Sequence, residues 1–451
     1  MEIWQIGMIV LVAVVLPNWA SLTIVVPVLM VLAYNGTVDP LLSFGETDIQ
    51  YFDLVLAIAL LKTGIALAVD RGHVGLGRVY VAILVFIGVM AAATVLASYR
   101  FEWDIIARPE AIALARLVVQ MSVLPLVVSS VRTLRGVAYC QKLVEYLGYA
   151  VAASIYLNVL GLFFDVTIGE VQITEAGVRY FGPLGDQIGF ILLFFIYQKG
   201  LEGRWIPALF LTGALFATGT RGSVIALIVG ITFLVWQSRR GLTSLNKRTM
   251  LTLIVLIVFS SILILYDVGS MQTRLVGTAF ESGWEQRVLT MSIATRVFVD
   301  NILTGVGYTG FRFLAMEYGA LEEFGVYFSP NYIATTSNQY LQAATDGGVV
   351  GLFAYIWMMS IILKHLKFAG SQTPSIKCSF YSASYVWLLS LLIGNQTAVW
   401  LLPGSLISYL LWLVLGLAIA TATNVRREQA VREWGNVRAL VSEQTEPSSV
   451  W

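Results

Sequence analysis

Charged side chains are scarce in this sequence. They account for 12% of its 451 residues, whereas 58% of the residues are hydrophobic. A soluble domain carries about a quarter charged residues, so this composition excludes an ordinary soluble enzyme. Hydrophobic runs of about 20 residues, the length that crosses a bilayer, recur from end to end. The sequence therefore predicts an all-α, polytopic transmembrane bundle that lies among membrane lipids.

Cysteine and histidine are also nearly absent, with two residues of each. So few ligands exclude a Cys/His metal cluster, and we expect neither a metal nor a cofactor. The formal net charge of +1 argues against nucleic acid as a partner. No short apolar stretch near the N-terminus ends in a small-residue cleavage site, so we expect no removable signal peptide.

The hydrophobic runs predict a series of membrane spans. The opening stretch, 4–34, is too long for one ordinary span and is interrupted at Pro17-Asn18, so it forms one kinked helix or two short ones. Twelve or thirteen helices are expected in all. The later spans are expected at 52–69, 79–97, 110–130, 143–163, 183–198, 205–218, 222–237, 250–267, 341–363, 378–398 and 404–422.

Lysine and arginine set the predicted orientation, because cytoplasmic loops carry an excess of both. Basic clusters alternate with the spans and place the C-terminus inside. We expect residues 1–423 to form the transmembrane domain and 424–451 a disordered cytoplasmic tail. The long segment 268–337 then lies on the outer face, where its many aromatic and apolar residues indicate a partly helical loop folded against the membrane.

The cations expected on the outer face are all arginines. A guanidinium grips phosphate through two parallel hydrogen bonds, whereas an ammonium acts as a point charge, so this face suits a phosphate or pyrophosphate ligand. Snorkelling and surface ion pairs are the structural alternative. These residues are Arg100, Arg108, Arg179, Arg221, Arg274, Arg287, Arg296 and Arg312.

Arg221 has the most unusual position among them. Residues 218–223 read Thr-Gly-Thr-Arg-Gly-Ser and join two apolar spans without a real loop. A charge there is costly unless it faces a polar cavity or a partner, and the flanking glycines let backbone approach a ligand. Lys62 and Arg116 are further cations within spans, which either line the same cavity or reach for the interface.

Three motifs and one upstream segment together resemble the O-antigen polymerase and ligase superfamily. Residues 219–223 are similar to its Ser/Thr-Arg-Gly signature, and Arg287 through Phe311 looks like its outer segment with an arginine followed by glycines. Ser337 through Leu352 resembles the family hallmark, which in ligases reads His, then Asn, Ser or Gln, nine residues, Gly, two residues and a small residue. Residues 179–186 also fit a family pattern.

The resemblance implies a metal-independent glycosyltransferase of the membrane-embedded C type. Such enzymes transfer a saccharide from undecaprenyl pyrophosphate to an acceptor hydroxyl on the outer side of the bacterial cytoplasmic membrane. Arg221 and Arg287 would then hold the pyrophosphate and stabilise developing charge. Arg179, Arg296, Arg312, Tyr308, Ser337 and Asn338 are the expected substrate-binding residues. A lipid-linked oligosaccharide would serve as donor and acceptor, with a chain-length regulator protein as a further partner.

One departure from the family pattern bears on the activity. Ser337 stands where the ligases have His, and both histidines, His73 and His365, fall on predicted cytoplasmic loops. This favours a polymerase that joins repeat units over a ligase. A general base would then be a carboxylate, with Asp346 preferred. The other acidic candidates are Asp300, Glu281, Glu285, Glu317, Glu322 and Glu323.

Two other interpretations fit the sequence less well. Residues 305–310 match the Gly-x-Gly-x-x-Gly dinucleotide pattern by letter, but no strand precedes them, so we interpret them as a glycine turn. A transporter of related architecture would also suit many spans with buried cations, although the inverted repeats common in carriers are not evident. A purely structural protein would leave the outer arginines unexplained.

Overall fold

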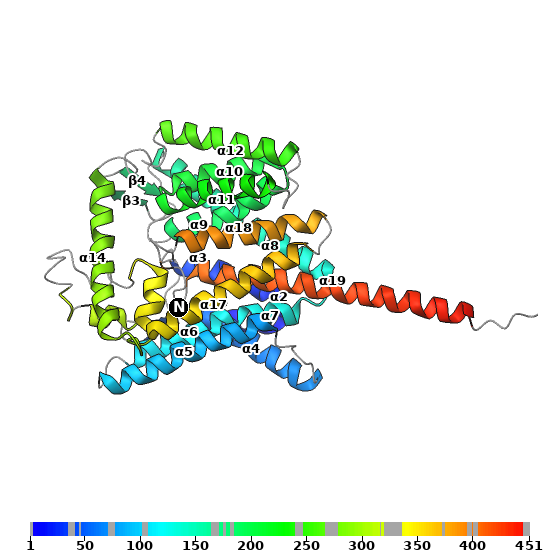
Figure 1. Ribbon diagram of the computed structural model, residues 1–451, viewed down its shortest axis with the longest axis horizontal. Helices are drawn as coiled ribbons and strands as arrows, with labels where there is room; N and C mark the ends of the chain where they lie inside the picture. The colour runs from blue at the N-terminus through cyan, green and yellow to red at the C-terminus, as the bar shows by residue number, and fades with distance from the viewer. Residues whose placement is uncertain are drawn as a thin grey trace, which may run out of the picture.

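The computed structural model describes most of the chain. The described residues are 3–34, 41–44, 47–70, 77–101, 107–163, 171–174, 177–180, 185–239, 247–266, 278–315, 317–319, 336–371, 375–394, 399 and 405–444. Most helices run side by side in one bundle, whereas α14 stands across one end of it, at the left of Figure 1. The helices are α1 (Ile3–Val15), α2 (Asn18–Ala20), the π-helix η1 (Ser21–Val25), α3 (Val26–Tyr34), α4 (Tyr51–Asp70), α5 (Arg78–Arg100), α6 (Ala107–Met121), α7 (Val123–Ser130), α8 (Leu134–Phe163), α9 (Gly185–Leu201), α10 (Trp205–Ala217), α11 (Arg221–Arg239), α12 (Lys247–Leu265), α14 (Thr278–Asp300), α15 (Phe311–Leu314), α17 (Gln339–Ser371), α18 (Ser375–Gly394) and α19 (Leu406–Gln444).

The all-α membrane bundle is confirmed. Within the described residues, six helices are long and apolar enough to cross a membrane. A backbone in lipid must satisfy its hydrogen bonds internally, which favours helices wherever the apolar runs occur. The helix through Leu406–Val425 is the central one, with 89% of its apolar window buried, whereas the corresponding window of α12 is only 22% buried and lies at the edge.

The predicted interruption at Pro17 is present. The opening stretch divides into α1 and the α2–η1–α3 run, because Pro17 has no N–H to continue the helix. The carbonyl groups left free at the end of α1 are bound by Lys62, whose Nζ donates to Val14 at 3.0 Å and to Leu16 at 2.6 Å. Lys62 therefore caps a broken helix.

The second intramembrane cation, Arg116, has a partner of opposite charge. Its Nε and Nη2 lie 3.1 and 2.7 Å from Oδ2 of Asp53, so the pair links α6 to α4. Lys62 and Arg116 therefore both make contacts between helices.

Two short antiparallel hairpins accompany the helices. They pair β1 (Leu42–Phe44) with β2 (Thr47–Ile49) and β3 (Val171–Thr174) with β4 (Gly177–Tyr180). In each case the strands join two helices of the bundle.

The C-terminal segment differs from the expected disordered tail. α19 continues to Gln444 and projects beyond the bundle, at the right of Figure 1. A helix already nucleated in the bundle extends at little cost through residues that favour helix, and the continuation contains several Arg, Glu and Ala residues.

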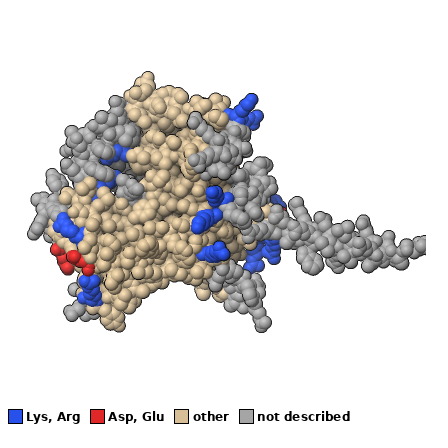
Figure 2. Space-filling view, in the orientation of Figure 1, with Lys and Arg blue, Asp and Glu red and all other residues tan. Residues whose placement is uncertain are grey.

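Charged atoms avoid the middle of the bundle. On the face drawn in Figure 2, Lys, Arg, Asp and Glu atoms lie towards the left and right ends, and the belt between them is uncharged. This distribution is typical of a protein that crosses a bilayer.

Candidate functional site

The helix that carries the third motif is broken in the middle. Gly348 of α17 has φ 65° and ψ −164°, a conformation that only glycine adopts readily. The break frees backbone groups that then pair outside the helix. The carbonyl of Asp346 accepts the N–H of Gly307 at 3.0 Å, and the N–H of Val349 donates to the carbonyl of Ile302 at 2.8 Å. Gly348 is also the glycine of the hallmark motif, so the backbone conformation at the break explains why glycine stands at this position of the motif.

Residues 305–310 form a glycine turn packed against this break. Gly305 and Gly307 have φ values of 67° and 84°, and Thr309, a β-branched residue, is held at 65°. Such a conformation is strained for Thr309 and persists only where its surroundings enforce it. The interpretation as a glycine turn is confirmed.

The side chain of Asp346 contacts the glycine turn and stabilises it. Its side chain is 1% exposed. One carboxylate oxygen accepts the Nε2 of Gln342 at 2.8 Å, and the backbone N–H of Thr309 donates to the same carboxyl group. The Oε1 of Gln342 in turn accepts the N–H of Thr336 at 3.0 Å. Asp346 thus connects the strained turn to the start of α17.

Glu110, in the first turn of α6, is the residue that sequence reasoning missed. It is fully buried, and neither carboxylate oxygen has a hydrogen-bond partner in the described part of the chain. The carboxylate lies against the turn, since a Cβ added at Gly307 or Gly310 would stand 3.1 or 2.6 Å from its oxygens. Asp346 and Arg312 are its charged neighbours.

Tyr308 and Arg312 complete this cluster. Tyr308 is 4% exposed, and its N–H donates to Oγ1 of Thr94 on α5 at 3.0 Å. Burial, and then the nearby Asp346, raise the pKa of Tyr308 well above 10.0, so the phenol stays protonated. Arg312 is half-buried on α15, with its guanidinium 4.4 Å from the centre of the Phe313 ring. Two acids, a cation and a phenol therefore surround the glycine turn.

Arg221 lies at a second position at this end of the bundle. It is the half-buried first residue of α11, reached from α10 through Gly219 at φ 64°. The hydroxyls of Thr218 and Thr220 are 2.7 Å apart in the same tight turn. A helix N-terminus favours anions and disfavours cations, so Arg221 is an electrostatically unusual first residue for α11.

The elements α12 and α14 lie near the start of α11 and near the glycine turn, respectively. The end of α12 packs beside the α10–α11 turn, where Leu263 and Ile264 cover Phe216 and Val224. α14 then stands across the same end of the bundle and leads into the glycine turn (Figure 1).

Two of the predicted arginines lie on α14. Arg287 is half-buried, and Arg296 is exposed with Nη1 3.5 Å from the carbonyl of Tyr318. Arg179 lies in β4 opposite Gln172, and its side chain is outside the described residues. The structure thus gathers Asp346, Tyr308 and Arg312 into one cluster and places Arg221 and the α14 arginines on separate elements.

Ser337 and Asn338 directly precede α17. Oδ1 of Asn338 accepts the N–H groups of Tyr340 and Leu341 at 2.9 and 3.0 Å, which makes Asn338 the cap of the helix. Ser337 has φ 57°, a left-handed conformation that is uncommon for serine.

The fold and this site define a multi-pass membrane protein in which two buried acids, Arg312 and a glycine turn form one cluster at one end of the bundle. Residues 206–356 match the family model of the O-antigen ligases. This match covers a third of the chain, from α10 to the middle of α17, so this region is similar to the O-antigen ligase family. No curated protein matches the chain.

Proposed function

We propose that this protein is a polymerase that joins undecaprenyl-pyrophosphate-linked oligosaccharide units into a surface polysaccharide. The family match supports polymerase or ligase activity in general. The observation that favours a polymerase is the lack of histidine at this site. Ser337 occupies the His position of the hallmark, and His365 lies roughly 25 Å along α17 beyond Gly348, at about 1.5 Å per residue. His73 is outside the described residues.

Pyrophosphate binding is assigned to Arg221 and Arg287. Arg221 adds a guanidinium to the N–H groups at the start of α11, and both groups favour a phosphate. Arg287 is presented by α14, which stands across the same end. Arginines in these positions would supply the charge stabilisation that a metal ion gives in other transferases.

The proposed reaction is a displacement at the anomeric carbon of the donor. A hydroxyl oxygen of the acceptor saccharide forms a bond to that carbon while the bond to the phosphate oxygen breaks. The electron pair leaves with undecaprenyl pyrophosphate, and attack from the opposite face inverts the anomeric configuration. Asp346 takes the hydroxyl proton in this scheme. Because Asp346 is buried beneath the glycine turn, the turn must move when the acceptor binds.

The remaining predicted residues order the saccharides. Arg179, Arg296 and Arg312 would contact donor or acceptor, and Tyr308, Ser337 and Asn338 border the glycine turn and the start of α17. We place the site on the outer side of the bacterial cytoplasmic membrane and the C-terminus in the cytoplasm. A chain-length regulator protein is a partner in this scheme.

A ligase is the second candidate, because the matching family model is described as O-antigen ligase. Deletion of the gene in its host, followed by gel analysis of surface glycan, separates the two. Loss of the long ladder with one repeat unit still on its normal anchor supports a polymerase. Loss of all attached glycan, with polymer remaining on the lipid carrier, supports a ligase. An unchanged profile would exclude both and favour a transporter.

A further inference from the structure

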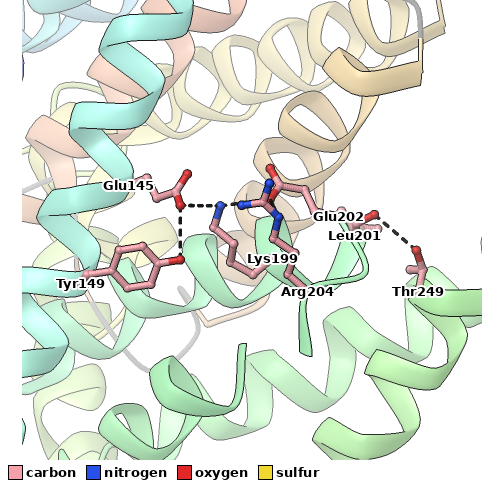
Figure 3. A network of polar contacts seen from close by, with 7 residues as sticks. All are labelled: Glu145, Tyr149, Lys199, Leu201, Glu202, Arg204 and Thr249. Atoms are coloured by element: carbon pink, nitrogen blue, oxygen red, sulfur yellow. Dashed lines mark hydrogen bonds and ion pairs between the residues drawn. The ribbon is translucent and has the colours of Figure 1, made fainter. Parts of the chain in front are cut away.

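A buried lysine organises the opposite end of the bundle. Lys199 lies in the last turn of α9 and is 1% exposed, with its Nζ 2.7 Å from Glu145 on α8 and 3.0 Å from Glu202. Tyr149 donates from its hydroxyl to Glu145 at 3.2 Å. Figure 3 shows Glu145 beside the ammonium group of Lys199 and Tyr149 beside Glu145. A buried charge with two carboxylate partners fixes the turn that follows α9.

That turn brings the beginnings of α10 and α12 together. Gly203 has φ 71°, and a Cβ added there would stand 3.0 Å from the Cβ of Arg248. Thr249 donates from Oγ1 to the carbonyl of Leu201 at 3.3 Å, as Figure 3 also shows. The first residues of α12 are therefore held directly against the turn that precedes α10.

The surface built by this contact is cationic and partly apolar. Arg204 is 63% exposed and lies 3.6 Å from Glu202, beyond normal hydrogen-bond distance. Lys247 and Arg248 are exposed on the first turn of α12. Among the residues that the structure describes at this turn, four cations, including Lys199, face the two carboxylates of Glu145 and Glu202, so this surface carries excess positive charge. The exposed apolar residues beside it are Trp205, Ile206 and Leu251.

We propose that Arg204, Lys247 and Arg248 bind the phosphate headgroup of an anionic phospholipid. The two arginines supply planar donors for phosphate oxygens, and Lys247 adds a point charge. Trp205 suits the headgroup level of a bilayer, where tryptophan is enriched. Ile206 and Leu251 offer apolar surface to the acyl chains. The site lies at the end of the bundle remote from the glycine turn and does not depend on the proposed glycan transfer.

Two features distinguish this site from scattered interfacial cations. Its cations come from the turn before α10 and from the first turn of α12, which are more than 40 residues apart in sequence, and the Lys199 network holds that turn in place. Basic pockets between transmembrane helices bind anionic lipid headgroups in this way. Saturable binding of few lipid molecules is therefore expected, as opposed to a diffuse attraction.

The test uses the full chain purified in neutral detergent. Dioleoyl phosphatidylglycerol or dioleoyl phosphatidylcholine is added, and both Tm and the number of bound lipids by native mass spectrometry are measured. We expect phosphatidylglycerol to raise Tm more and to bind saturably. Arg204→Gln with Arg248→Gln should weaken apparent binding by about 10- to 30-fold, since each cation near an anionic surface contributes roughly fivefold.

The matched control is Arg132→Gln with Arg135→Gln. These exposed arginines near the start of α8 are expected on the same side of the membrane but lie outside the site. Binding kept in the control and lost in the site variant supports the proposal. Equal losses in both variants, or no preference for phosphatidylglycerol in the wild type, would overturn it. Equal stabilisation by inorganic phosphate would also overturn the lipid assignment. Arg204 and Arg248 are both exposed. The Tm of the site variant without lipid should therefore stay within about 2 °C of the wild-type value.

Discussion

The N–H of Gly307 donates a 3.0 Å hydrogen bond to the carbonyl of Asp346, and this bond joins the glycine turn to the break in α17. Each irregular segment satisfies backbone groups that the other leaves free. In a bundle surrounded by lipid, such backbone is tolerated only where protein groups pair with it. The break and the turn therefore form one structural unit, and a change in either should disturb both.

Gly348→Ala should destabilise this unit severely. A Cβ there would stand 2.5 Å from the carbonyl oxygen of Leu303, and the backbone conformation is nearly exclusive to glycine. Strain and overpacking together predict a loss of about 2–5 kcal/mol in the free energy of unfolding. Gly347→Ala is the control, because its Cβ would meet the flexible end of Met90 at 2.9 Å. Similar Tm values for both variants would contradict the account of the break.

Glu110→Gln should impair glycan transfer without unfolding the protein. The carboxyl group lies against the glycine turn, with Asp346 and Arg312 as charged neighbours. Replacing one of its oxygens with an amide NH2 should shift the turn, and a shift of about 1 Å can lower a rate about 100-fold. We therefore expect transfer to fall by at least about tenfold in membranes with equal protein levels. Glu428→Gln, at an exposed acid on α19, should leave the rate unchanged. Wild-type activity of Glu110→Gln would remove this residue from the site.

Lys199→Met should lower stability by about 2–4 kcal/mol, measured by thermal unfolding in detergent. Removing one partner of a buried ion pair leaves the other uncompensated, at a cost of about 3–5 kcal/mol. Water still reaches the carboxylates of Glu145 and Glu202, which are 20% and 24% exposed, so a smaller loss is expected here. Lys364→Met, at an exposed lysine, should change Tm little. A stable Lys199→Met protein would show that the network does not fix the α9–α10 turn.

Tyr308 should contribute a stability loss at alkaline pH. Its pKa in the folded protein is raised well above 10.0, chiefly by burial. The unfolded chain ionises this phenol near pH 10, whereas the folded chain keeps it neutral. The contribution of Tyr308 to the free energy of unfolding is therefore fully present below pH 10 and is lost as pH rises further. Tyr308→Phe should flatten the decline of Tm between pH 9 and about 11. Tyr99→Phe, at a tyrosine that is 84% exposed, should have no such effect.

Much of the bundle could be predicted because long apolar runs leave few alternatives in a membrane. The interruption at Pro17 was predicted from a single residue with no N–H. The role of Lys62 was not, because its partners are carbonyls 46–49 residues away in sequence. The hairpins were missed because strands of three or four residues show no clear periodicity.

The candidate site was only partly predictable. The glycines near 305–310 indicated a turn, but only the fold shows that Gly348 breaks α17 and that Asp346 braces the turn. Glu110 was overlooked because an acid at the start of an apolar run resembles an ordinary interfacial residue. An acid that lies within the hydrophobic region is costly without a partner, and that cost was the available signal.

The most direct test of the central claim is the glycan ladder in cells that carry Arg221→Gln in place of the wild-type gene. Arg221, at the start of α11, is assigned to the pyrophosphate, so the account predicts single repeat units on the normal anchor and no long ladder, at normal protein levels. Arg100→Gln, at an exposed arginine on α5, should keep the full ladder. A full-length ladder from Arg221→Gln would contradict the account.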